Sequence, residues 1–377
     1  MPPEKLFTPG PTAVPWQVLE TMSRPLIHHR TKEFREIHRE AAENLKYVYR
    51  TSDPVVILTA SGSGAMEAAV ANLTRVGEKA IVIEVGKFSE RWRELGEAYG
   101  LDLVVLKAEW GDPIDPDQVA KAFDENSGVG IVFVTHCETS TGVLQDVKTI
   151  ARIAHEKGAL IAVDGITSLC AQNVQTDDWG LDAVIGGSQK GFMTPPGLSF
   201  ISLSENARER MEAGRHPVYY FDLIKAVKAL EKNDTPYTPA HTVIIALNEA
   251  LRMIKEEGLE NVIRRHTRNA KATRAAVKAL GLKLFSAMPC NATTAAVPPD
   301  GTADKIRNHM VERYGVRIAG GQGPVKGKII RLGHLGYYHE TDMYTMISAL
   351  EGTLVDLGLS DTPGQGIEAL LRSFAED

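Results

Sequence analysis

Short apolar runs alternate with longer amphipathic segments over much of the chain. The short runs have the length and β-branched content of buried strands, whereas the longer segments carry apolar residues at helical spacing. Strands that alternate with crossover helices predict an α/β fold with a mainly parallel, doubly wound sheet. The predicted strands of this sheet are residues 55–60, 79–85, 102–108, 130–137, 160–163, 181–185 and 197–204.

The pattern changes after about residue 235. Two long helical segments come first, within residues 235–258 and 259–281. Short apolar runs follow, together with amphipathic segments over residues 302–314 and 340–357. Short strands mixed with helices in this way are typical of a smaller α+β domain.

We therefore predict two domains. Residues 1–257 should form an N-terminal arm and a large domain, and residues 258–377 a small C-terminal domain. The arm, residues 1–15, is rich in proline and glycine, and an amphipathic helix is expected over residues 31–50. A chain of 377 residues with 43% apolar content is long enough for two domains.

Composition narrows the class of protein. The formal net charge of -6 argues against a partner that is nucleic acid or an anionic membrane. No apolar run approaches the roughly 18 residues of a membrane span, and the N-terminus lacks the apolar core of a signal peptide. The three cysteines, Cys137, Cys170 and Cys290, are widely spaced and form no CxxC motif. We expect a cytoplasmic protein without a metal site or a disulfide framework.

Two polar residues stand at the ends of successive buried strands. Asp164 ends one apolar run, and Lys190 follows the next run after Gly186-Gly187-Ser188-Gln189. Ligands of an open parallel sheet bind beyond the carboxyl ends of its strands. Pyridoxal 5'-phosphate (PLP) needs both groups, a lysine for its Schiff base and a carboxylate at its ring nitrogen. The alternatives are an aspartate that caps a turn and a solvated lysine, but the pairing favours the cofactor.

A Gly/Ser turn offers a site for a phosphate. Ser61, Gly62 and Ser63 lie between the first predicted strand of the sheet and its helix. Small residues, hydroxyl groups and a helix N-terminus suit a phosphate. Glu67 stands where a dinucleotide fingerprint requires glycine, so a phosphate monoester is favoured over a pyrophosphate. Gln189 can add a donor.

Three more residues are candidates for the site. Phe88 follows a strand, where its ring could stack on a pyridine or belong to the core. Thr139 follows the strand GIVFVTH and can hydrogen-bond the cofactor or a substrate. Arg331 lies in the apolar strand KIIRLGH, where a guanidinium needs an anion. That anion is a substrate carboxylate or the partner in an internal salt bridge.

These motifs resemble those of the class V aminotransferases, which are PLP enzymes of fold type I. The likeness is greatest to the branch of alanine–glyoxylate and serine–pyruvate (serine–glyoxylate) aminotransferases. It covers nearly the whole chain in the family's order. The matching segments are FTPGPT, SGSGAMEAA, THCETSTGVLQ, VDGITSL, GGSQKGFMTPPG, EEGLENV and GGQGPVKGKIIRLGHLG.

The resemblance implies a role for each matching residue and a homodimer with shared active sites. Phe88 departs from relatives that have tryptophan there, and Ser63 from members that have histidine. The resemblance implies that Lys190 is the Schiff-base lysine and proton shuttle and that Asp164 is the partner of the ring nitrogen. Thr139 would contact the ring edge, and Arg331 would bind the substrate α-carboxylate. The implied phosphate contacts are Ser61, Gly62, Ser63 and Gln189, together with Thr238 from the partner subunit.

The predicted function is PLP-dependent transamination by a ping-pong mechanism. The amino group moves from a small L-amino acid, serine or alanine, to a 2-oxo acid, glyoxylate or pyruvate. An aspartate aminotransferase is the first alternative, and it would need a second cation, for which Arg30 is a weak candidate. A PLP lyase of the cysteine desulfurase kind lacks support, because no cysteine lies in the Gly-rich loop near Arg331. A non-enzymatic, hydrogenase-associated subunit is the last alternative, and the retained catalytic residue types argue against it.

Overall fold

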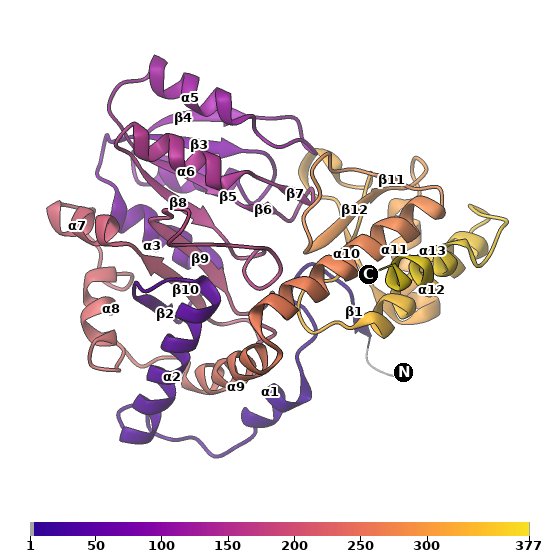
Figure 1. The fold of residues 1–377 in the computed structure, drawn as a ribbon, viewed down its shortest axis with the longest axis horizontal. Helices are drawn as coiled ribbons and strands as arrows, with labels where there is room; N and C mark the ends of the chain where they lie inside the picture. The colour runs from indigo at the N-terminus through magenta and orange to yellow at the C-terminus, as the bar shows by residue number, and fades with distance from the viewer. Residues whose placement is uncertain (1–3, 377) are drawn as a thin grey trace.

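A computed structural model describes residues 4–376 (Figure 1). Its largest sheet has seven strands, and all of them run parallel except β10, which is antiparallel to both of its neighbours. The predicted α/β fold with a mainly parallel sheet is confirmed. In order across the sheet the strands are β2 (Val55–Leu58), β10 (Ser199–Leu203), β9 (Ala183–Gly187), β8 (Leu160–Asp164), β5 (Val129–Thr135), β3 (Lys79–Glu84) and β4 (Asp102–Lys107).

The reversed direction of β10 follows from the short connection that precedes it. Only residues 188–198 separate β9 from β10, and a parallel crossover needs a dozen or more residues. Ser188 and Leu198 close this loop, since the Ser188 N–H donates to the Leu198 carbonyl at 3.0 Å. Lys190 therefore lies in a loop that is tied at both ends to the sheet.

Helices cover both faces of the sheet, as the doubly wound prediction requires (Figure 1). Each face has its own buried apolar cluster. On one face pack α2 (Lys32–Tyr49), α5 (Pro116–Glu125), α6 (Val147–Glu156) and α9 (His241–Glu257). On the other pack α3 (Gly62–Leu73), α4 (Glu90–Ala98), α7 (Glu205–Ala213) and α8 (Leu223–Leu230).

The C-terminal part is built on a four-stranded antiparallel sheet. The short strands and mixed helices predicted after residue 235 are present. A C-terminal helix, α13 (Gln365–Ala375), is present as well and was not predicted. The sheet order is β11 (Lys283–Leu284), β12 (Thr293–Val297), β15 (Ile330–Gly333) and β14 (Ala319–Gly320), with the helices α11 (Ala303–Tyr314) and α12 (Glu340–Asp356) and the 3-10 turn η1 (Gly323–Val325) beside it.

Two segments join the large sheet to the C-terminal part. Helix α10 (Leu259–Ala279) begins in the core of the large sheet through Val262 and ends in the C-terminal core through Val277. In the N-terminal arm, β1 (Lys5–Leu6) pairs with β13 (Val316–Arg317), and Phe7 is buried in the C-terminal core. A short helix, α1 (Trp16–Thr21), then packs on α9. The division at residue 257 remains a prediction, although the arm itself packs on the C-terminal part.

Within residues 4–376, no helix has the length and apolar character that crossing a membrane requires.

Replacement of Trp92 tests the packing of the sheet against its helices. Trp92 of α4 is fully buried and stacks on Phe133 of β5, with the ring centroids 4.8 Å apart. The Trp92→Ala variant should lower the free energy of unfolding by about 3–5 kcal/mol, because a large cavity remains. Val76→Ala, at a side chain that is 77% exposed, should change it by less than about 0.5 kcal/mol. Urea titration measures both, and equal losses would contradict this packing.

Candidate active site

Eight of the ten predicted site residues line one small cavity. The cavity lies at the carboxyl ends of five strands that run in the same direction, which is where an α/β sheet binds its ligands. The segments that follow these strands each supply part of the lining. The predicted residues in the lining are Ser61, Gly62, Ser63, Phe88, Thr139, Asp164, Gln189 and Lys190, and the others are Arg91, Ile166 and Thr167.

Asp164 is buried at the end of β8 and faces this cavity. One carboxylate oxygen accepts a hydrogen bond of 2.9 Å from the Ile166 N–H, and the other lies 3.5 Å from the Thr135 hydroxyl. Burial raises the pKa of Asp164 to about 6, although the bond from Ile166 opposes this effect. The carboxylate is therefore mostly ionised at neutral pH, and a cationic ring nitrogen would compensate its charge.

Lys190 is buried in the loop after β9 and lines the same cavity. Burial lowers the pKa of Lys190 to about 8, and the positive charge of Arg331 contributes to this lowering. Its ammonium lies 5.8 Å from the centroid of the Phe88 ring and donates to the carbonyl of Pro9 in the N-terminal arm. A lysine with this pKa can lose its proton and attack an aldehyde.

The Gly/Ser turn presents unused donors at the start of α3. Ser61 is the N-cap residue, but its side chain makes no capping hydrogen bond. Gly62 packs closely on Ile166, since a Cβ atom would lie 2.3 Å from Cδ1 of Ile166 and that side chain would have to move. Gln189 is in the same lining, and the Nε2 group of its amide could donate to a phosphate. Free hydroxyl groups and a helix N-terminus suit a bound phosphate.

These features fit PLP. The cavity has a carboxylate and a lysine for the two reactive ends of the ring, an aromatic side chain for its face, and a phosphate-binding turn. Ser61, Gly62, Ser63 and Gln189 could hold the phosphate, and Phe88 could cover the ring.

Arg331 lies next to this cavity without forming part of its lining. Its Nη1 donates to the Thr139 carbonyl at 2.8 Å, and its Nε donates to the Gly320 carbonyl at 2.8 Å. The guanidinium is buried, and burial lowers its pKa to about 10. Within residues 4–376, no carboxylate lies at ion-pair distance from Arg331, so the internal salt bridge that the sequence also allowed is not found. The group can still bind an external carboxylate.

Thr238 and Arg30 lie outside the cavity in a single chain. Thr238 is exposed and lines a separate hollow with Thr59 and Tyr220. Arg30 forms an ion pair with Asp234. The role predicted for Thr238 requires a second subunit and stays a prediction.

Sequence reasoning missed three contributions to the site. Glu138 is fully buried beside Thr139, at the end of the short strand β6 (Cys137–Glu138), and no local signal in the sequence marks it. Thr167 hydrogen-bonds Thr139 through the two hydroxyls, 2.6 Å apart, and it follows Asp164 closely enough to have been a candidate. Arg91 lines the cavity with its guanidinium carbon 5.5 Å from the Phe88 ring centroid. In the sequence Arg91 looks like part of an ordinary solvated helix face.

None of the three cysteines lines the cavity. Cys137, Cys170 and Cys290 are free thiols buried in the core. Over residues 4–376, no cluster of three or more histidine, cysteine, aspartate or glutamate side chains could hold a metal ion.

Comparison with known proteins identifies the family. The model of the class V aminotransferases matches residues 6–337. A protein of Anabaena cylindrica called soluble hydrogenase 42 kDa subunit is 45% identical, and the match covers 98% of each chain. The L-aspartate–glyoxylate aminotransferase of Paracoccus denitrificans is 36% identical over 98% of this chain and 96% of its own. The serine–glyoxylate aminotransferase of Methylorubrum extorquens is 36% identical over 99% and 96%.

Solved structures agree with this result. Pyridoxamine–pyruvate aminotransferase of Mesorhizobium loti superposes with a TM-score of 0.95 over 100% of this chain and 98% of that chain, at 28% identity. An aspartate aminotransferase of Thermus thermophilus gives a TM-score of 0.87 over 93% and 99%, at 35% identity. The chain belongs to the class V aminotransferases and is a PLP-dependent enzyme of that family.

Proposed function

We propose that this aminotransferase moves the amino group of serine or alanine to glyoxylate or pyruvate in two half-reactions. The observation that carries this proposal is the state of Arg331. Its guanidinium is buried, its positive charge acts on Lys190, it is oriented by two backbone carbonyls, and no carboxylate pairs with it in residues 4–376. Such a group suits the α-carboxylate that amino acids and 2-oxo acids share.

The residues around Lys190 would hold and tune the cofactor. When bound, PLP supplies an aldehyde that combines with amino groups and a pyridinium ring that accepts electrons from the substrate. Asp164 would keep a proton on the ring nitrogen, since a buried carboxylate is best stabilised by a cation. The turn of Ser61, Gly62 and Ser63 would bind the phosphate, with Gln189 beside it, and Phe88 would restrict the ring to one plane.

Lys190 would move the proton at the substrate Cα. Its lowered pKa lets the neutral amine form near neutral pH, and its Nζ atom can then take the Cα proton and return it elsewhere. Arg331 would fix the substrate by its carboxylate while this happens. The cavity is small and its lysine and aspartate are buried, which keeps water away from the transferred proton.

The arrangement of cations favours a substrate with one carboxylate. The charge of Arg331 acts on the pKa of Lys190, whereas the charge of Arg91 acts on the pKa of Asp164. Arg91 would therefore act mainly on the ring-nitrogen partner, whereas Arg331 would face the reacting lysine. Arg30 is already paired with Asp234. Aspartate remains the second candidate donor, because the Paracoccus and Thermus relatives are called aspartate aminotransferases.

A lyase and a hydrogenase subunit have less support than a transaminase. A desulfurase-like lyase would need a reactive thiol, but the three cysteines are buried and none lines the cavity. The name of the Anabaena relative suggests a hydrogenase subunit, yet this chain retains the complete set of candidate catalytic residues.

A homodimer is part of the proposal. Thr238 is exposed in one chain and lies outside the cavity, so it could reach a phosphate only in the active site of a partner subunit. The partner would then complete the site that Ser61, Gly62 and Ser63 begin.

A half-reaction screen tests the donor and Lys190 together. Serine or alanine, mixed with the PLP-loaded protein, should convert the cofactor to its amine form, which absorbance reports. Lys190→Ala should abolish this conversion and covalent attachment of PLP. Lys121→Ala, a change at an exposed lysine of α5, should leave both intact. If only aspartate converts the cofactor, serine and alanine are not the donors. If PLP is still covalently attached in Lys190→Ala, the assignment of Lys190 as the Schiff-base lysine is wrong.

The pKa of Lys190 predicts how capture of PLP depends on pH. The pKa of about 8 means that the neutral, reactive amine accumulates as the pH rises through 8. The rate of covalent attachment of PLP to the apoprotein should therefore rise with a midpoint near that value. Arg331→Gln should move the midpoint to higher pH, because it removes a positive charge that lowers this pKa. Stopped-flow absorbance measures the rate, and a midpoint near the ordinary 10.5 would contradict this environment.

The role of Arg331 predicts a loss of substrate binding. Arg331→Gln should lower kcat/KM for both donor and acceptor by about 10- to 100-fold, because a charge-assisted hydrogen bond to the carboxylate is lost. Arg317→Gln is the control, since Arg317 lies on β13 in the same part of the chain and pairs with Glu4 at the surface. Steady-state kinetics decide the outcome. An unchanged KM for both substrates in Arg331→Gln would place their carboxylates elsewhere.

A further inference from the structure

We propose that Glu138 is a positioning residue that holds Phe88 and Arg331 in place around Lys190. It touches neither the candidate cofactor cavity nor the substrate end, and it acts through the two residues that do. This inference goes beyond the proposed substrates, and it rests only on the PLP site.

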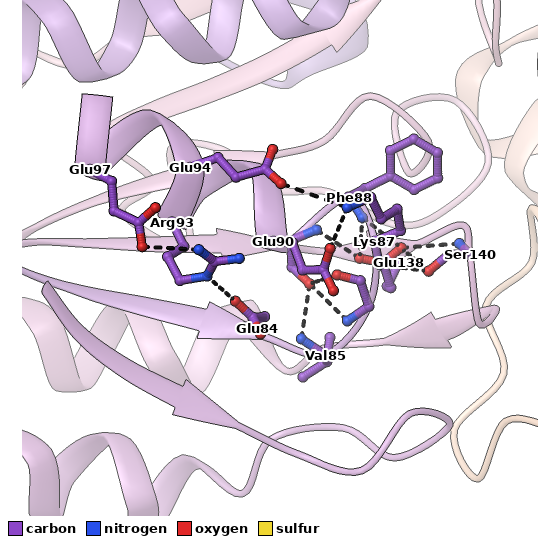
Figure 2. Close-up of polar contacts among 12 residues, drawn as sticks. Glu84, Val85, Lys87, Phe88, Glu90, Arg93, Glu94, Glu97, Glu138 and Ser140 are labelled. Atoms are coloured by element: carbon purple, nitrogen blue, oxygen red, sulfur yellow. Dashed lines mark hydrogen bonds and ion pairs between the residues drawn. The ribbon is translucent and has the colours of Figure 1, made fainter. Parts of the chain in front are cut away.

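Glu138 accepts hydrogen bonds from the turn that carries Phe88 (Figure 2). Its carboxylate accepts hydrogen bonds from the N–H groups of Phe88 at 3.1 Å and Ser89 at 2.8 Å. It also accepts from the Ser140 N–H at 3.0 Å and from the Ser140 hydroxyl at 2.6 Å. The Ser140 hydroxyl in turn accepts from the Lys87 N–H at 3.0 Å. The turn between β3 and α4 is therefore bonded directly and indirectly to one carboxylate.

The turn is shaped to receive this carboxylate. A Cβ atom at Gly86 would lie 2.5 Å from Cγ of Glu138, so only glycine allows the approach. Ser89 folds back on the turn, where its hydroxyl accepts from the N–H groups of Val85 at 2.9 Å and Gly86 at 3.0 Å. The N–H groups of Phe88 and Ser89, directly before α4, then point to Glu138, and the dipole of α4 adds a favourable term.

The same residue is linked to Arg331 through its neighbour in the chain. Thr139 follows Glu138, and its carbonyl accepts the 2.8 Å hydrogen bond from Arg331 Nη1. The negative charge of Glu138 also acts on Arg331, where it opposes the lowering of the pKa by burial. A shift of the Glu138 backbone would thus move Phe88 and the guanidinium together.

A comparison with Glu84 indicates that Glu138 does more than stabilise the fold. Glu84 is a buried glutamate at the end of β3, and it is neutralised by Arg93 at 2.8 Å and Lys107 at 2.8 Å. Glu138 is fully buried, yet no cation lies at ion-pair distance from it within residues 4–376. Burying an unpaired carboxylate is costly, and N–H and O–H donors alone compensate it here. Unlike Glu84, Glu138 therefore directs its charge to the turn that carries Phe88.

Glu138→Gln tests this role, with Glu84→Gln as the matched control. A glutamine amide keeps one acceptor oxygen but replaces the other with an NH2 donor, so it cannot accept from both the Phe88–Ser89 turn and Ser140, and Phe88 should be held less firmly. The Kd of the apoprotein for PLP should rise about tenfold, and the induced circular dichroism of bound PLP should weaken. Glu138→Asp keeps the charge and should restore part of the affinity. Glu84→Gln should lower the Tm, because Arg93 and Lys107 lose their partner, but it should leave the Kd for PLP and the circular dichroism of bound PLP unchanged.

A double-mutant cycle with Phe88→Ala decides whether Glu138 acts through Phe88. Adding Glu138→Gln to Phe88→Ala should raise the Kd for PLP by less than twofold, because coupled residues are not additive. Fully additive effects, or an unchanged Kd and dichroism in Glu138→Gln, would overturn the proposal. If Glu138→Gln does not fold, Ser140→Ala replaces it in the cycle with the same criteria. Failure of the wild-type protein to bind PLP would instead refute the cofactor site.

Discussion

Two ionisable side chains, Asp164 and Lys190, are buried where neighbouring parallel strands end, and the site is organised around them. Burial shifts the pKa of both groups toward neutrality, to about 6 and about 8. Neither group forms an ion pair within residues 4–376, so a ring with a cationic nitrogen and an aldehyde matches what each lacks. The adjacency of β8 and β9 makes this possible, because it directs both side chains into one cavity.

Segments far apart in the chain depend on that placement. The N-terminal arm reaches Lys190 through Pro9 and is held on the C-terminal part by β1. Arg331 comes from the four-stranded sheet of that part and bonds to Thr139 at the edge of the large sheet. Lys190 is thus surrounded by the large sheet, the arm and the C-terminal part, and any motion between these parts would alter its surroundings.

Much of this arrangement could be predicted from the sequence because it rests on local patterns. Alternating apolar runs indicated the sheet, and strand ends followed by polar residues indicated Asp164, Lys190 and the Gly/Ser turn. The direction of β10 depends on the length of its preceding loop, and α13 covers a core that only the folded chain has. The buried position of Glu138 could not be predicted, because its partners are backbone N–H groups of a turn about 50 residues away. Thr238 needs a second subunit, which one sequence does not place.

The most direct test is a crystal structure of the protein with PLP added. We predict continuous density from the Nζ atom of Lys190 to the cofactor, with the ring nitrogen hydrogen-bonded to Asp164 and the phosphate at the turn of Ser61 and Ser63. Density for PLP at another lysine, or a ring whose nitrogen faces away from Asp164, would contradict this assignment.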